Sequence, residues 1–238
     1  MGVIVPFANG KGGVGKSTLA CSYAVEAAKA GVNVLIADLN DEQHTAATWA
    51  DTRVRNGYKP EIAVKIVQAR SVPELAGRCD MLVVDTPSWT NANNVALARV
   101  ATFMVVPTGP NVSAELVPTI QLLRALTAAP LPAWQFGVAL ARFNASAAAN
   151  EEKIARALLA DAGYPAMSGV LRQLASFGVA FAEGRGISET SREGLNAEAV
   201  ELLSSIAGGV RAASRLLARS QSRGKERERE RERGGRGR

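Results

Sequence analysis

Residues 10–18 of the chain read Gly10-Lys11-Gly12-Gly13-Val14-Gly15-Lys16-Ser17-Thr18, and this stretch decides the fold. A glycine is followed by four residues and then by Gly-Lys-Ser, the spacing of a loop that binds phosphate groups. An apolar run at residues 3–8 precedes the stretch, and a helical pattern at residues 17–30 follows it. A strand, a glycine turn and a helix N-terminus together predict that backbone N–H groups and the helix dipole bind the phosphates of a nucleoside triphosphate.

The side chains of this stretch have separate expected roles. Lys16 is expected to reach the β- and γ-phosphates, and the Ser17 hydroxyl is expected to bind Mg²⁺. Asp85 ends the apolar run 81–85, roughly seventy residues after the loop, where phosphate-loop proteins place an acid that orients Mg²⁺. We therefore predict that a nucleoside triphosphate and Mg²⁺ are the cofactors, with residues 10–18 holding the nucleotide and Ser17 and Asp85 serving the metal.

Apolar runs alternate with helical patterns along the rest of the chain. The expected strands are residues 34–38, 63–67, 81–85, 103–106 and 136–140, and the expected helices are residues 41–55, 113–128, 151–162 and 195–219. Strands that are apolar throughout favour a parallel sheet covered on both faces. The predicted fold class is α/β, a mainly parallel twisted sheet with helices on both faces, formed by a single domain of residues 1–218.

Composition limits the classes of protein to which the chain can belong. Hydrophobic residues make up 47% of its 238 residues, yet no apolar run approaches membrane-spanning length. The first strand starts almost at the N-terminus, and the two cysteines, Cys21 and Cys79, lack metal-ligand spacing. We expect a cytoplasmic protein with small, buried cysteine side chains.

The net charge of +6 is distributed unevenly. Residues 219–238 hold nine Lys or Arg and four Glu, whereas residues 1–218 hold 19 basic and 18 acidic side chains. The basic character therefore belongs to a charged Arg/Glu-rich tail of residues 219–238. Because the tail from residue 221 onward has no apolar residue with which to pack, we expect it to be disordered or a loose helix that does not dock on the core.

The lysine at the second position of the loop, Lys11, is not needed to bind phosphates. With Lys11, residues 9–18 resemble the deviant Walker A motif of the ParA/MinD family of ATPases. Within that family, the chain is most similar to small ParA-type partition ATPases without an N-terminal helix-turn-helix. Weaker matches follow at the strand end Asp38, at Asp85-Thr86-Pro87, at residues 105–108 and at residues 177–189. The resemblance adds Pro107 to the expected nucleotide-binding residues.

The resemblance also implies a homodimer. In that family two ATP-bound subunits face each other, and the signature lysine reaches into the partner's site, which is the role that Lys11 would take. ATP would join the two subunits, and hydrolysis would release them. Lys11 and Lys16 are therefore candidate catalytic residues, both placing positive charge against the phosphates.

The second strand end departs from the family pattern. The family usually has Asp-x-Asp-Pro-Gln there, and this chain has Asp38-Leu39-Asn40-Asp41-Glu42-Gln43. Without a gap, Asn40 replaces the second acid and cannot act as a base; with one inserted residue, Asp41 takes the role. Asp38 and Asp41 are the candidate catalytic acids, and slow hydrolysis is expected.

The resemblance implies partners as well. The family binds DNA without sequence preference through basic residues near the C-terminus, and here Arg211, Arg215 and Arg219 recur every four residues. The expected function is an ATP-dependent switch for plasmid or chromosome partition. A ParB-like centromere-binding or adaptor protein would stimulate it, and it would be associated with the nucleoid.

Two alternatives stay open. The first is a MinD-like membrane-cycling positioning ATPase, although stable membrane association is not expected because Gly208-Gly209 interrupts the apolar residues of the last helix. The second is a scaffold that holds ATP and hydrolyses it very slowly.

Overall fold

The computed structural model describes residues 2–145 and 148–235, and its centre is a seven-stranded sheet. The strands are β1 (Val3–Phe7), β2 (Val34–Asp38), β3 (Ala63–Ile66), β4 (Met81–Asp85), β5 (Met104–Thr108), β6 (Phe136–Asn144) and β7 (Leu171–Gln173). Their spatial order is β3-β2-β4-β1-β5-β6-β7, and neighbouring strands pair in parallel. The predicted α/β fold class is confirmed, and the strand that leads into the loop lies in the middle of the sheet.

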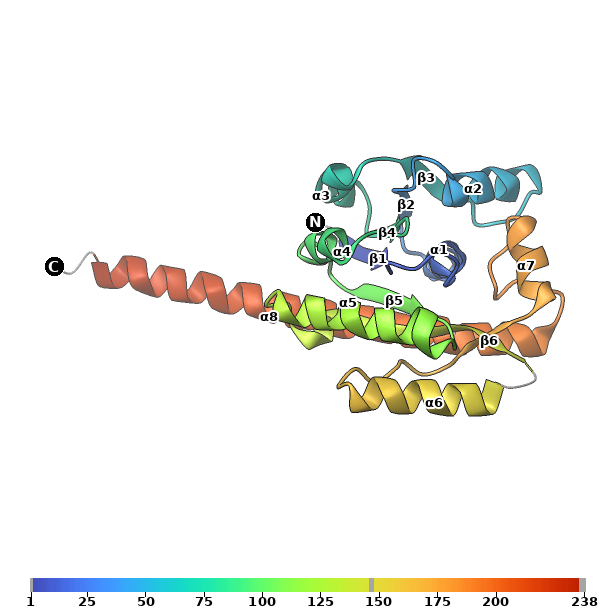
Figure 1. The fold of residues 1–238 in the computed structure, drawn as a ribbon. Helices are drawn as coiled ribbons and strands as arrows, with labels where there is room; N and C mark the ends of the chain where they lie inside the picture. The colour runs from blue at the N-terminus through green and yellow to red at the C-terminus, as the bar shows by residue number, and fades with distance from the viewer. Residues whose placement is uncertain (1, 146–147, 236–238) are drawn as a thin grey trace.

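Helices cover both faces of the sheet (Figure 1). On one face lie α1 (Lys16–Lys29), α2 (Thr45–Arg55), α7 (Ala175–Ala182) and α8 (Glu193–Gly235). On the other face lie α3 (Val72–Leu75), α4 (Asn91–Ala98), α5 (Val117–Ala128) and α6 (Ala148–Asp161). Each face buries its own apolar cluster, as expected for parallel strands whose side chains are apolar on both sides.

The carboxyl ends of the parallel strands meet at one edge of the sheet. The segments that follow β1, β2 and β4 leave this edge side by side, because Phe7 aligns with Asp85 and Asp85 with Asp38 in the register. Ligands of open α/β sheets bind at this edge. The fold thus brings the loop, Asp38 and Asp85 together from separate parts of the sequence.

Several elements differ from the sequence-based expectation. The helix expected at residues 41–55 begins only at Thr45, and residues 41–43 form a turn. The strand expected at residues 136–140 continues to Asn144. The elements β7, α7 and α4 were not expected, and the helix expected from residue 113 opens with a π-helical turn, Val112–Leu116, ahead of α5.

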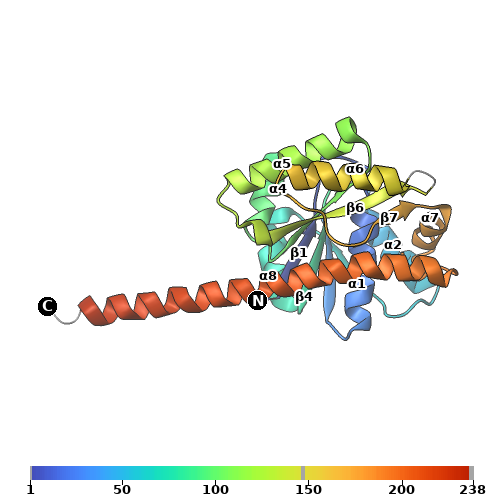
Figure 2. The same ribbon diagram turned by 90° about the horizontal axis from the view of Figure 1, so that it is seen from below.

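The last helix is longer than expected. Packing anchors its first half, where Leu202, Ile206 and Ala213 are buried beside α1. α8 runs through Gly208 and Gly209 to Gly235 and projects away from the body (Figures 1 and 2). The boundary between residues 1–218 and a tail of residues 219–238 stays a prediction, and α8 crosses it without a break. Among the residues described, no helix is both long and apolar enough to cross a membrane.

Candidate functional site

The loop between β1 and α1 forms the floor of the site. Gly13 and Gly15 adopt left-handed backbone conformations, with φ of 74° and 93°. Such angles are open to glycine and costly for other residues, so they explain two of the glycines in the stretch. The loop ends at Gly15, where α1 starts with Lys16, and its first-turn N–H groups face the edge of the sheet. This is an arrangement for binding an anion.

Lys16 is the buried cation of the loop. Its ammonium donates hydrogen bonds to the Lys11 carbonyl at 2.8 Å and to the Ser88 hydroxyl at 3.4 Å. Burial lowers the pKa of Lys16 below its ordinary value, although the charge of Asp85 opposes this effect. Lys16 therefore connects the loop after β1 to the segment after β4.

Asn9 fixes the start of the loop. It is 1% exposed, and its amide donates to the Pro107 carbonyl at 2.8 Å and to the Thr119 hydroxyl at 2.9 Å. Its side-chain oxygen accepts a hydrogen bond from the Lys11 N–H at 3.0 Å. Pro107 was expected to contact the nucleotide; it lies within β5 and holds the loop through Asn9.

Asp85 is the carboxylate best suited to hold a metal ion. It is 1% exposed, it accepts a hydrogen bond from Ser17, and within the described part of the chain its Oδ1 atom meets no hydrogen-bond partner. Burial, with the nearby charge of Asp38, raises the pKa of Asp85 to about 7, against the hydrogen bond from Ser17 and the charge of Lys16. An orphaned buried oxygen beside a hydroxyl fits a divalent cation.

The remaining ligands of such an ion would come from elsewhere. The described residues contain no group of three or more His, Cys, Asp or Glu side chains able to hold a metal. Mg²⁺ commonly keeps several waters and binds through one or two protein groups plus the phosphates of a substrate. The pair Ser17 and Asp85 therefore fits Mg²⁺ that arrives with a nucleotide.

Asp38 lies next to this pair but supports the backbone. Its Oδ2 accepts hydrogen bonds from the N–H groups of Ala46 and Ala47, at 3.0 and 3.2 Å, and its Oδ1 from that of Asn40 at 3.0 Å. Asp38 therefore caps the N-terminus of α2. His44, the residue before α2, has a left-handed φ of 48°. A catalytic role for Asp38 stays a prediction.

Asn40 and Asp41, the two candidates for the second acid, have different surroundings. The Asn40 side chain closes a turn: it accepts hydrogen bonds from the N–H groups of Glu42 and Gln43, at 3.3 and 3.1 Å. Asp41 is exposed at the tip of that turn. Both residues line the cavity above the loop. Asp41, the acid that aligns with the family pattern when one residue is inserted, is therefore available at the site.

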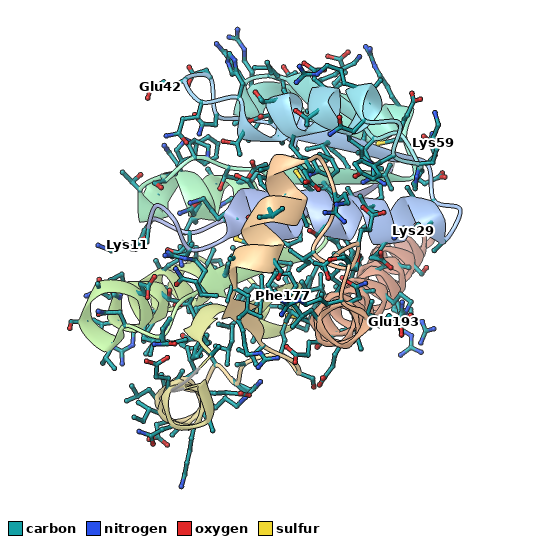
Figure 3. The ribbon with its side chains drawn as sticks, turned by 90° about the vertical axis from the view of Figure 1, so that its right-hand side faces the viewer. Lys11, Lys29, Glu42, Lys59, Phe177 and Glu193 are labelled. Atoms are coloured by element: carbon teal, nitrogen blue, oxygen red, sulfur yellow. The ribbon has the colours of Figure 1, made fainter. Side chains whose placement is uncertain are left out.

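A cavity of about 950 Å³ opens above the loop. Its lining comes from five segments: residues 12–18 of the loop and α1, residues 40–45, residues 86–89, Arg142 of β6, and residues 171–181 of β7 and α7. Phe177 and Phe181 of α7 form an apolar wall opposite the polar loop (Figure 3 labels Phe177). A polar floor with an apolar wall suits a ligand that has both charged groups and a flat ring.

Comparison with known proteins decides the family. Residues 5–218 match the model of the CobQ/CobB/MinD/ParA nucleotide binding domain. The chain belongs to this family. It is thus a P-loop protein of the ParA/MinD type, a family of ATPases, as the sequence resemblance indicated. No curated protein matches the chain in sequence.

Solved structures of the ParA/MinD type share the fold. The cell division protein MinD of Aquifex aeolicus superposes with a TM-score of 0.67 at 16% identity, over 87% of this chain and 97% of that one. A putative plasmid partition protein of Borrelia burgdorferi bound to AMPPNP gives 0.65 at 15% identity, over 87% and 99%. MinD of Pyrococcus horikoshii complexed with Mg-ADP gives 0.65 at 18% identity, over 87% and 96%.

The family's second loop lysine, Lys11, is exposed. Its side chain extends from the edge of the molecule (Figure 3), whereas Lys16, five residues later, is buried within the loop. The two lysines of this ParA/MinD-type loop therefore point to different places. Any role of Lys11 in the site of a second subunit stays a prediction.

The three arginines expected to bind DNA lie away from the cavity. Arg211, Arg215 and Arg219 are exposed on α8, and Arg211 borders a smaller groove between α8 and α1. The structure brings Lys16, Ser17, Asp38, Asp41 and Asp85 together at the sheet edge. It does not bring the arginines of α8 into the same site.

Sequence analysis missed Arg142 and the wall formed by β7 and α7. Arg142 donates a hydrogen bond to the Gly13 carbonyl, so it touches the loop from a position 129 residues later in the chain. Its place depends on an irregularity of β6 that leaves no mark in the sequence. The wall had one signal, the resemblance of residues 177–189 to the family, but the resemblance did not predict that these residues line the site.

Proposed function

We propose that this chain is an ATP-dependent, dimerising switch ATPase for the partition of a plasmid or chromosome. In the ATP state two subunits associate and bind DNA without sequence preference. A ParB-like centromere-binding or adaptor protein stimulates hydrolysis and so releases the DNA. The protein acts in the cytoplasm, on the nucleoid.

The observation that carries the proposal is the divergence of the two loop lysines. Lys16 is 7% exposed and donates a hydrogen bond to the Lys11 carbonyl, while the Lys11 side chain stands in solvent outside its own cavity. We take this outward orientation of Lys11 as support for a contact with the phosphates of a second subunit. A two-fold arrangement would give both subunits the same contact.

The residues of the site fit ATP·Mg²⁺. Bound Mg²⁺ would neutralise phosphate charge, and Ser17 and Asp85 are the side chains that would hold it. The N–H groups of the loop and of the first turn of α1 would bind the phosphates, and Lys16 would add a positive charge that is already desolvated. Asp41, at the cavity rim, would accept a proton from the attacking water. Its exposed position in a turn makes slow unassisted turnover the expected behaviour.

The DNA contact is assigned to α8. Arg211, Arg215 and Arg219 are exposed, and a spacing of four residues places them along one side of the helix. Contacts of this kind bind the phosphate backbone and carry no sequence information. Among proteins with this fold, one is described as a putative plasmid partition protein, which supports the choice of cargo.

The test is DNA binding with ATP, with ADP and without nucleotide, on the full chain. We expect salt-sensitive binding that requires ATP and is abolished in Lys11→Ala. Lys65→Ala, which removes an exposed lysine from the edge strand β3, is the matched control and should behave as the wild type. Sedimentation in the same buffers should show an ATP-dependent dimer that Lys11→Ala does not form.

Three results would contradict this function. Binding to DNA without nucleotide would assign it to the basic C-terminal segment alone. An ATP-dependent dimer that ignores DNA and sediments with anionic phospholipid vesicles would favour a MinD-like membrane-cycling ATPase. Tight ATP binding with no turnover, even with a partner present, would favour a scaffold.

A further inference from the structure

We propose that Arg142 of β6 binds the phosphate chain of the nucleotide held by its own subunit, as a second cation beside Lys16. This inference rests on the proposed function, since it assumes that the cavity takes a nucleotide. It assigns a binding role to a residue outside the loop. The backbone, the hydrogen bonds and the charge of Arg142 each support that role.

The backbone at Arg142 is strained. Its φ is 64°, in the left-handed region that residues other than Gly, Asn and Asp adopt at a cost, and His44 is the other non-glycine residue described with a positive φ. The register of β6 against β7 shifts at the same place, between Ala141 and Phe143. Strand irregularities next to active sites re-aim side chains, and strain of this kind is concentrated at functional sites.

The strained backbone directs the side chain to the phosphate loop. Ala141 and Phe143, on either side, are fully buried, while Arg142 lines the cavity. Its Nη1 donates a hydrogen bond to the Gly13 carbonyl, and a Cβ atom built on Gly13 would lie 3.3 Å from that nitrogen. The guanidinium therefore lies against the glycine segment whose N–H groups are expected to surround the phosphates.

The charge of Arg142 is only loosely paired. Its Nη1 is 3.9 Å from the Glu115 carboxylate, and its side chain is 40% exposed. Arg172, in the same cavity lining, differs: its Nε donates to Glu198 at 2.9 Å and its Nη2 donates to the other oxygen of that carboxylate. A guanidinium offers five N–H donors in a plane, which suits bidentate binding of phosphate. Arg142 keeps donors for a ligand, whereas the fork of Arg172 is already occupied.

The loose pairing also has a geometric reason. Oε2 of Glu115 accepts a hydrogen bond from the Asn111 N–H at 3.0 Å, within the π-helical turn before α5. The carboxylate also lies against Gly109, where a Cβ atom would overlap it, so a glycine at this position leaves room for Glu115. Glu115 therefore stays near Arg142 without closing on it.

The experiment replaces Arg142 with asparagine, which tolerates the left-handed backbone and removes the charge. We expect the dissociation constants of Mg-ATP and Mg-ADP to rise about tenfold or more, as for removal of one charge-assisted hydrogen bond. The salt dependence of binding should weaken, and the thermal midpoint of the nucleotide-free protein should stay the same or rise. Arg142→Lys should recover part of the affinity, and Arg124→Asn, on the exposed side of α5, is the matched control.

The inference fails if Arg142→Asn binds both nucleotides as the wild type does, or if its affinity and thermal midpoint fall together and lysine restores neither. The first result would leave the proposed function intact, because the wild type would still bind nucleotide. A wild-type chain that binds neither ATP nor ADP would instead overturn the proposed function itself.

Discussion

Two buried charged side chains of this molecule, Arg53 and Asp85, differ in how completely they are hydrogen-bonded. Arg53 of α2 is fully buried, and its guanidinium donates to the carbonyls of Pro60, Lys59 and Gly184 at 2.7, 2.9 and 3.0 Å and to both oxygens of Glu189. Asp85 is almost as buried, and one of its oxygens has no partner among the described residues. Both side chains belong to the same fold, but the described part of the fold supplies hydrogen-bond partners for every donor of Arg53 and not for both oxygens of Asp85.

The difference separates structure from function. A buried charge with every donor paired stabilises one arrangement of the segments around it, here α2 and the segment that leads into α8. A buried charge left short of partners is costly to the apo protein and is kept where a ligand supplies what is missing. The pKa values agree: burial raises that of Glu189, but the hydrogen bonds from Arg53, Gly186 and Lys29 bring it below its ordinary value, whereas that of Asp85 rises to about 7.

Removing the satisfied charge should have the largest effect on stability. Arg53→Ala takes two hydrogen bonds from Glu189 and removes the guanidinium donor from three carbonyls, so the free energy of unfolding should fall by about 3–5 kcal/mol. Urea denaturation measures it. Arg55→Ala, two residues along α2 and exposed, is the control and should change stability by less than about 0.5 kcal/mol. Equal midpoints for the two variants would contradict this interpretation of Arg53.

Removing the unsatisfied charge of Asp85 should stabilise the nucleotide-free protein and abolish its stabilisation by Mg-ATP. Asp85→Asn removes a carboxylate whose pKa burial raises to about 7, so at pH 8 the nucleotide-free protein should gain up to about 4 kcal/mol. The same variant should lose the stabilisation that Mg-ATP gives the wild type. Thermal denaturation with and without Mg-ATP measures both effects, and a destabilised Asp85→Asn protein would refute the comparison.

The pH dependence of stability follows from the same carboxylate. Between about pH 4 and pH 7 native Asp85 keeps a proton that it has lost in the unfolded chain, so the stability of the apo protein should fall as pH rises through this window. In Asp85→Asn the fall should be shallower by up to about 4 kcal/mol across the window. Parallel pH profiles for the two proteins would show that Asp85 is ionised in the native state throughout.

Variants in the turn after β2 test which residue acts as the general base. Asp41 is exposed at the cavity, and the Asn40 side chain is occupied in closing the turn, so Asp41→Ala should lower kcat about a hundredfold, as for loss of a general base. Asn40→Asp should leave kcat within a few-fold, and both should keep the affinity for ATP. An unchanged Asp41→Ala together with a faster Asn40→Asp would reverse the assignment and favour the scaffold alternative.

Replacing exposed charges should have the smallest effect per residue on stability. Replacing Arg211, Arg215 and Arg219 by glutamine should leave the unfolding free energy nearly unchanged, because water already solvates these side chains. The slope of log affinity for DNA against log salt should become shallower by roughly 0.9 for each phosphate that the variant no longer neutralises. Glutamine at Arg55, Arg70 and Arg78 removes the same charge elsewhere on the surface and should leave the slope unchanged.

The sequence predicted the parts of the site that are local. The loop, the strand before it, the helix after it and Asp85 at the end of β4 are each encoded within a few neighbouring residues, and the structure places them as expected. Apolar strands also predicted the parallel sheet, because burial on both faces is visible in composition alone.

The rest depends on contacts between distant segments. The expected helix start at Asp41 was wrong, because the cap of α2 comes from Asp38, eight residues before Ala46. The full burial of Arg53 requires Gly184, where a Cβ atom would lie 2.3 Å from the Arg53 backbone nitrogen. Arg142 reaches Gly13 where the register of β6 against β7 shifts, and no residue type in the sequence predicts that shift. These features follow from packing, which periodicity does not record.

The length of α8 gives the protein a mechanical property. Ala213 is the last fully buried residue whose burial is described, and residues 214–235 continue the helix beyond the body by roughly 33 Å at 1.5 Å per residue. The base of this lever is fixed near the Arg53 network, where Asn196 of α8 holds Thr190 through its side chain. From Asn196 to Gly235 the helix is about 58 Å long, so a tilt of about 10° at the base would carry the far end through roughly 10 Å. A small rearrangement beside α2 would thus become a large displacement at the tip.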